Sequence, residues 1–231
     1  MSMSSVLRTI GTTTLRYRRE VQPLHFPESE PEDERVPEGM SHLILRTFLW
    51  RVLRFAYASQ HSAGCDQFVY WNARSPKRNC APDVFVKLGR PQEIFGTWKT
   101  WERGAPELIV EIVSPTEQLL TWDQKFERFY ELGAREIVRF DPEQPAGSRF
   151  RVWDRIDDDL VEREITGDTT PCLTLGLWWV VRPVEGDAVG LRLARDIEGR
   201  KLLLAPEEAA TESLDAAQSR IAELEAELRK R

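Results

Sequence analysis

The sequence predicts a mixed α/β domain followed by a separate C-terminal helix. Apolar residues recur at helical spacing after His42, and several β-branched and aromatic runs typical of strands come next. A second helical run ends at Gly133, and further strand-like runs follow it. Strands on both sides of a helical segment favour a sheet that is mixed rather than purely parallel. The length of 231 residues suits one large core with an appendage.

The first 38 residues are expected to form a flexible leader. Residues 23–39 are rich in proline and acidic residues, a composition typical of extended, mobile chain. The first 20 residues carry arginines but no apolar core of a secretory signal. A disordered leader, a targeting peptide and a mistaken start codon all remain open for this segment.

The domain itself is expected over residues 39–205, and its first helix is predicted from His42. Apolar residues recur on one helical face, at positions 44, 45, 48, 49, 52, 53 and 56. Ser41 is placed to cap this helix. Strands are then expected over Gln67–Trp71 and Ala81–Gly89, with a polar turn between them.

A buried strand is predicted at Pro106–Ser114, and a helix at residues 116–133 with Gly133 as its C-terminal cap. Further strands are expected beyond this helix, over residues 134–143, in a hairpin over 149–165 with its tip at the IDDD sequence, at 172–183, and in a last hairpin over 188–203.

The C-terminal segment, residues 206–231, has the pattern of a heptad helix. Its apolar positions alternate in steps of three and four, at Leu214, Ala217, Ile221, Leu224 and Leu228. A short coiled coil, which would join two copies of the chain, fits this pattern. An amphipathic helix docked on its own domain fits it as well.

Charge and cysteine usage narrow the class of protein. The net charge is −6, but the acidic surplus lies in residues 20–38 and 206–231, which leaves the body near neutral. Strong non-specific DNA binding is therefore not expected, although a local basic groove remains open. The three cysteines are far apart, and no apolar run is long enough for a membrane helix. These features predict a soluble protein of a reducing cytoplasm.

The central strand PELIVEIVSP, residues 106–115, contains a carboxylate where an apolar side chain is expected. An ionised Glu111 in a strand covered on both faces is costly unless it is paired or binds a cation. If the preceding strand is antiparallel to it, Asp83 reaches the same place. Two carboxylates there suit a hard divalent cation, Mg²⁺ first and Mn²⁺ as a substitute. Alternatively, Asp83 caps a turn.

Other residues offer further roles near these carboxylates. Lys125, near the start of the second helix, can aim its ammonium at them and position a water molecule. Alternatively, it is an exposed helix lysine. Glu111 itself has an alternative as the partner of an arginine, either Arg128 or Arg139.

Several segments of the chain together resemble a known protein family. The chain resembles the Uma-two family of restriction endonucleases, within the PD-(D/E)XK nuclease-like superfamily. The resemblance rests on the segments PDVFVKLG and PELIVEIVSP, on the acid and lysine at the start of the next helix, and on FYELGAREIVRFDPE. The resemblance covers most of residues 36–183. It implies a restriction-endonuclease-like core of helix, three strands, helix and strand, followed here by extra C-terminal β-hairpins and the heptad helix.

The resemblance also implies site residues. Asp83 and Glu111 would be catalytic metal ligands, and Lys125 would replace the lysine that the nuclease pattern has two residues after the acid, where this chain has Val113. The family tyrosine four residues after the lysine is Phe129 here. His42 is a further catalytic candidate at the start of the first helix, and Glu38 is another.

Four basic residues are candidate nucleic-acid contacts. Lys77 and Arg78 lie in the polar turn before Asp83. Lys99 and Arg103 lie beside Trp98 and Trp101, whose rings could stack on bases. A solvated loop with its aromatic rings tucked inward is the alternative.

Together these features predict Mg²⁺-dependent phosphodiester hydrolysis of nucleic acid, most naturally by a DNA endonuclease that acts as a homodimer. The alternative is a catalytically inactive module of the same fold, which works in binding or assembly through its C-terminal helix.

Overall fold

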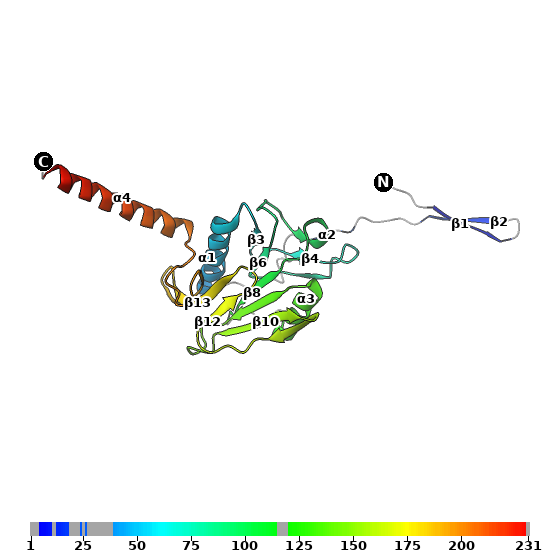
Figure 1. The fold of residues 1–231 in the computed structure, drawn as a ribbon. Coiled ribbons are helices and arrows are strands. Elements are labelled where there is room, and N and C mark those ends of the chain that lie inside the picture. The colour runs from blue at the N-terminus through cyan, green and yellow to red at the C-terminus, as the bar shows by residue number, and fades with distance from the viewer. Residues whose placement is uncertain are drawn as a thin grey trace.

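The computed structural model describes residues 5–10, 13–18, 24, 26, 39–114 and 120–229. It confirms the predicted mixed α/β architecture (Figure 1). The helices of the described residues are α1 (Met40–Tyr57), α2 (Thr100–Arg103), α3 (Trp122–Leu132) and α4 (Pro206–Leu228). None of these helices is both long enough and apolar enough to cross a membrane.

The main sheet has six strands in the order β11-β10-β9-β8-β6-β3. In chain order these are β3 (Ser62–Gly64), β6 (Val84–Lys87), β8 (Leu108–Ile112), β9 (Glu136–Phe140), β10 (Phe150–Ile156) and β11 (Asp159–Glu162). Neighbours pair antiparallel except β8 and β9, which are parallel. A parallel pair requires a crossover connection, and α3 lies in it.

Two smaller sheets and a hairpin complete the described chain. One sheet contains β4 (Val69–Tyr70), β5 (Asn79–Cys80) and β7 (Trp98–Lys99), and the other contains β12 (Thr169–Cys172), β13 (Leu177–Val184) and β14 (Asp187–Ala194). The hairpin pairs β1 (Ser5–Ile10) with β2 (Thr13–Arg18), inside the segment that the sequence assigns to a leader. The sequence pattern predicted no strands there.

Strand β8 is buried on both faces, as its apolar run predicts. Leu108, Val110 and Ile112 belong to the core that contains the apolar face of α1. Ile109 belongs to a second core on the other side of the sheet, with Phe129 of α3. All five residues of β8 are buried, so any polar side chain on this strand must find its partners inside the protein.

Helix α3 begins and ends with strong local signals. The Thr121 hydroxyl accepts a hydrogen bond from Gln124 N, and Gln124 Oε1 accepts one from Thr121 N, which forms a capping box. Gly133 ends the helix in the left-handed region at φ 89°, as predicted. The positions of both helix ends are therefore determined by the residues of α3 itself.

The first strand of the main sheet lies where the sequence pattern did not place it. The predicted strand at 67–71 is reduced to β4 in a small separate sheet, and β3, with the sequence Ser-Ala-Gly, takes the edge of the main sheet. A side chain at Gly64 would put its Cβ 2.2 Å from the buried ring of Phe85. Close packing, rather than strand propensity, therefore selects this segment.

Two hairpin predictions have different outcomes. The hairpin over 149–165 is confirmed as β10 and β11, and Asp157 and Asp158 at its tip adopt positive φ values of 49° and 67°. The hairpin over 188–203 is present only in part, with backbone hydrogen bonds from Arg195 N to the Lys201 oxygen and from Leu203 N to the Leu193 oxygen, whereas the long ladder of β14 is with β13, over five consecutive residues. Beyond β14 only a single bridge joins Ala194 to Leu202 within the described chain.

Helix α4 is anchored at its first turn and exposed beyond it. Glu208 accepts two hydrogen bonds from the buried guanidinium of Arg192, at 2.7 and 2.8 Å. Arg51 of α1 donates to Glu207 at 2.6 Å. From residue 210 to 229 every side chain is exposed, and the helix points away from the sheet domain (Figure 1). The alternative of a helix docked along its own domain does not match this arrangement.

Gly64→Ala is expected to destabilise the domain by about 1–3 kcal/mol, because the added methyl must displace a ring in a closely packed core. Gly39→Ala is the control, since a Cβ there meets nothing within 4 Å and the backbone is extended. Urea denaturation of both variants measures the free energy of unfolding. Equal stability of the two variants would contradict this account of β3.

Candidate active site

Glu111 lies in the middle of the main sheet with its carboxylate turned toward α3. The residue is 3% exposed. Its Oε2 accepts a hydrogen bond from Lys125 Nζ at 2.6 Å, and its Oε1 accepts one from Asp83 N at 3.3 Å. An adjacent ammonium offsets the cost of burying the carboxylate. Lysine, rather than an arginine, is therefore the cation that holds Glu111.

The two arginines proposed as alternative partners of Glu111 have other contacts. Arg128 donates to the carbonyl oxygen of Asn79 at 3.0 Å. The guanidinium of Arg139 lies 4.9 Å from the ring centre of Trp122, in a cation–π contact.

Asp83 lies beside Glu111 because β6 and β8 are antiparallel, as the sequence analysis supposed. Val84 is paired with Val110, so the residue before Val84 meets the residue after Val110. Asp83 Oδ2 accepts a hydrogen bond from Ile112 N at 2.7 Å, and the residue is 8% exposed. Sheet register therefore brings the two carboxylates together.

His42, in the first turn of α1, completes the group. Its Nε2 lies 3.2 Å from both carboxylate oxygens of Asp83 and 3.0 Å from the carbonyl oxygen of Ile112. A carbonyl oxygen can only accept, so Nε2 carries a hydrogen in this arrangement. The candidates His42, Asp83, Glu111 and Lys125, which come from α1, β6, β8 and α3, thus form one cluster. The further candidate Glu38 lies outside the described residues.

The cluster contains oxygen atoms of the kind that a hard cation prefers. Its donors are the two carboxylates and the Ile112 carbonyl oxygen, which the sequence could not reveal because it is a main-chain group. Mg²⁺ is commonly held by one or two carboxylates and keeps several waters, so this donor set fits it. In the ranges 39–114 and 120–229, no group of three or more His, Cys, Asp or Glu residues could hold a metal.

Glu107 shows that burial and pairing alone do not mark a site. It lies just before β8, is 8% exposed, and forms an ion pair with Lys87. Its Oε2 also accepts a hydrogen bond from Leu88 N at 2.8 Å. Lys87 and Leu88 lie at the end of β6 opposite to Asp83, so Glu107 is paired in the same way as Glu111 but outside the cluster.

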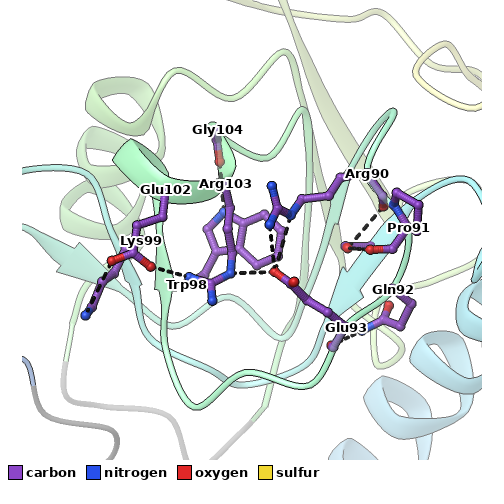
Figure 2. A network of polar contacts seen from close by, with 10 residues as sticks. Arg90, Pro91, Gln92, Glu93, Trp98, Lys99, Glu102, Arg103 and Gly104 are labelled. Atoms are coloured by element: carbon purple, nitrogen blue, oxygen red, sulfur yellow. Dashed lines mark hydrogen bonds and ion pairs between the residues drawn. The ribbon is translucent and has the colours of Figure 1, made fainter.

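Two of the predicted nucleic-acid contacts are engaged in a network around the loop before β7. Figure 2 shows Arg103 between two carboxylates, with its Nε 2.7 Å from Glu93 and its Nη1 2.7 Å from Glu102. Its guanidinium also lies 5.8 Å from the ring centre of the buried Trp98. Lys99 lies 3.7 Å from Glu102. These contacts bind the loop together, and a role in nucleic-acid binding stays a prediction.

The Glu93 carboxylate is held ionised by this network. Hydrogen bonds from Arg103 and Arg90 lower its pKa below the ordinary value for glutamate. A depressed pKa means that this contribution is present at neutral pH and lost as the pH falls through the folded-state value.

The other two predicted contacts, Lys77 and Arg78, lie close to α3. Arg78 donates to Glu131 at 2.6 Å, whereas Lys77 is exposed and lines a cavity beside the helix.

A sequence model of the Uma2 (Uma-two) family, described as "Putative restriction endonuclease", matches residues 33–185. The chain belongs to the Uma2 family. The match includes the whole cluster, from His42 to Lys125.

Among solved structures, this Uma2 protein is similar to a crystal structure from Anabaena variabilis, titled as a "putative nuclease belonging to DUF820". The identity is 14%, the TM-score is 0.45, and the similarity covers 62% of this chain and 76% of that chain. No curated protein matches the chain.

Lys125→Met is expected to destabilise the protein by about 1–3 kcal/mol, because it leaves a buried acceptor without its charged donor. Adding Glu111→Gln to this variant is expected to restore part of the loss, since the uncompensated charge disappears. Chemical denaturation of the single and double variants measures the coupling.

Lys99→Met serves as the control for this pair. Its ion pair with Glu102 is longer and near the surface, so we expect a change below about 1 kcal/mol. A loss at Lys99 as large as that at Lys125 would contradict a special role of the Glu111 pair.

Proposed function

We propose that the chain is a Mg²⁺-dependent phosphodiesterase that cleaves DNA internally, with Mn²⁺ as a substitute cation. The observation that carries the proposal is the convergence of His42, Asp83, Glu111 and Lys125 on one spot, within a chain of the Uma2 family. Apart from the short β4, β5, β7 and α2 between them, the elements α1, β3, β6, β8, α3 and β9 follow one another along the chain, which supports a restriction-endonuclease-like core of helix, three strands, helix and strand.

In this proposal Asp83 and Glu111 hold the cation, together with the carbonyl oxygen of Ile112. When bound, a divalent cation lowers the pKa of a water molecule and polarises the scissile phosphate. The side chains of the site position the groups that react and supply hydrogen bonds to them. Burial at the ends of two strands keeps both carboxylates in fixed positions, which a site of this kind requires.

Lys125 and His42 supply the hydrogen-bond donors. The Lys125 ammonium, held 2.6 Å from Glu111, orients the attacking water and stabilises negative charge that develops on the phosphate oxygens. His42 Nε2–H donates to the carbonyl oxygen of Ile112 beside Asp83, and so holds these two proposed ligands in place. The attacking water gives up one proton to solvent, and its oxygen forms a bond to phosphorus as one P–O ester bond breaks. The alcohol leaves with a proton taken from solvent.

Purified protein with Mg²⁺ or Mn²⁺ is expected to nick supercoiled plasmid DNA. Asp83→Asn, Glu111→Gln and Lys125→Ala each remove a proposed participant, so we expect each to reduce the nicking rate at least a hundredfold. Glu107→Gln is the matched control, because it neutralises a buried, lysine-paired carboxylate beside the same strand and should leave nicking intact. Equal activity of all four variants would rule out the assignment.

Metal binding separates this proposal from a catalytically inactive module. Mn²⁺ is expected to raise the melting temperature of the wild type but not of Asp83→Asn, because a ligand that binds the folded state stabilises it by mass action. A protein that shows neither the shift nor nicking would instead favour the module that acts through its C-terminal helix.

We also propose that residues 39–205 form the catalytic domain of a cytoplasmic protein, and that α4 pairs two copies of the chain. The apolar positions of the heptad are exposed, Leu214 and Ile221 by 57%, Leu224 by 43% and Leu228 by 69%. In a parallel pair Arg220 of one copy faces the partner's Glu225 across the seam, and the opposite charges favour this pairing. A dimer would bring two sites to one duplex.

Ile221→Glu is expected to convert a dimer into a monomer, because it places a charge in the apolar seam. Ala222→Glu adds the same charge one position away from the seam and should leave the dimer intact. Light scattering after size exclusion measures the mass, with 26.8 kDa for one chain. A wild-type monomer, or equal masses for the two variants, would contradict pairing through this seam.

A further inference from the structure

A cavity of about 300 Å³ lies between α3 and the turn that joins β4 to β5. We name it the Trp71 cavity. The wall from α3 consists of Gln124, Glu127, Arg128 and Glu131, which share one helical face. The wall from the turn consists of Trp71, Lys77 and Arg78.

The residues of both cavity walls lie close to candidate active-site residues along the chain. On α3, Lys125 is adjacent to Gln124 and precedes Arg128 by three residues, about 4.5 Å along the helix axis. On the opposite wall, β5 ends at Cys80, three residues before Asp83. The bond from Arg128 to the Asn79 carbonyl oxygen ties the walls together at 3.0 Å. A molecule in the cavity would therefore lie next to the cluster.

The buried Cys80 thiol lies within electrostatic reach of Arg128 in the cavity wall and of Glu111 and Lys125 in the site. Burial raises its pKa well above the ordinary value, Glu111 raises it further, and Arg128 and Lys125 act in the opposite direction. The charges of the cavity wall and of the proposed catalytic pair therefore both act on the Cys80 thiol.

The chemistry of the lining suits a flat polar ring. The half-buried Trp71 offers an aromatic face, and Leu120 adds apolar surface. Lys77 makes no ion pair within the described part of the chain and can donate, while the exposed Glu127 can accept. Of the cations in the lining, Arg78 is hydrogen-bonded to Glu131 and Arg128 to the Asn79 carbonyl oxygen. The lining is therefore of mixed charge and offers no cluster of available cations for a free phosphate. A nucleobase has two flat faces and carries donors and acceptors on its edge.

We propose that the Trp71 cavity binds one unstacked nucleobase beside the scissile phosphate, with Trp71 as the stacking platform. This proposal rests on the proposed hydrolysis of nucleic acid. The volume lies at the lower end of the range for small-ligand pockets, which suits one base and leaves no room for a duplex. The base must therefore come from a single strand, or leave the stack of a duplex before it enters.

The proposal is tested by binding of fluorescent single-stranded oligonucleotides that carry one abasic residue, moved through the sequence position by position. EDTA prevents cleavage, salt is held constant, and fluorescence anisotropy reports the affinity. Anchoring the strand at one end through a short duplex fixes its register. For the wild type, we expect one abasic position to weaken binding about five- to a hundredfold, the usual effect of losing one base–aromatic stack.

Trp71→Ala is expected to remove this position dependence, so that the intact and abasic strands bind equally. Trp71→Phe keeps an aromatic face and should retain part of it, which guards against a loss caused by misfolding. Arg74→Ala, from the same turn but outside the cavity lining, is the control and should keep the full dependence. Melting curves of all variants verify the fold.

Two results would overturn the subsite. One is a flat abasic profile for the wild type, and the other is a position dependence that survives in Trp71→Ala. If plasmid nicking still occurs in either case, the proposed hydrolysis stands and only the subsite fails. If the wild type neither binds these strands nor nicks DNA, both proposals fail.

Discussion

The ion pair between Lys125 and Glu111 is the interaction on which the rest of the structure depends. It joins the central strand β8 to α3, the helix of the single parallel crossover in the described sheet. A carboxylate that is 3% exposed is tolerated only with such a partner. The pair therefore couples the position of α3 on the sheet to the placement of the proposed catalytic ammonium, because one contact serves both purposes.

Each end of β8 has a buried glutamate paired with a lysine, but the two glutamates have different surroundings. At one end Glu107 is satisfied by Lys87 and a backbone amide, and its surroundings are purely structural. At the other end Glu111 lies beside Asp83 and His42 and is paired with Lys125 from the first turn of α3. The two ends differ in the groups that converge around the buried charge, since burial and pairing are common to both.

Two arginines, Arg192 and Arg103, hold segments at the periphery of the domain in place. Arg192 is buried against the ring of Phe48 and holds Glu208 at the first turn of α4, so the exposed heptad starts from a fixed base. Arg103 closes the loop before β7 in a similar way. Planar guanidinium groups suit such positions because they combine paired hydrogen bonds with aromatic contact. These cations thereby differ from Lys77, which remains available at the rim of the Trp71 cavity.

The sequence by itself determined the elements whose signals are local. The apolar period predicted α1 and α4, Gly133 marked the end of α3, and the unbroken apolar run predicted a β8 buried on both faces. The start of α3 was predicted at residue 116, whereas the capping box at Thr121 places it at Trp122. The odd carboxylate in the apolar run of β8 singled out Glu111, and the family resemblance supported Asp83 and Lys125 as candidates. Only the tertiary structure decided that Ser62–Gly64 forms the edge strand, because close packing against Phe85 overrides strand propensity. It also decided that lysine rather than arginine pairs with Glu111, and that Trp71 faces α3 across a cavity. Contacts between distant segments depend on sheet register and on helix placement, which no local sequence pattern encodes.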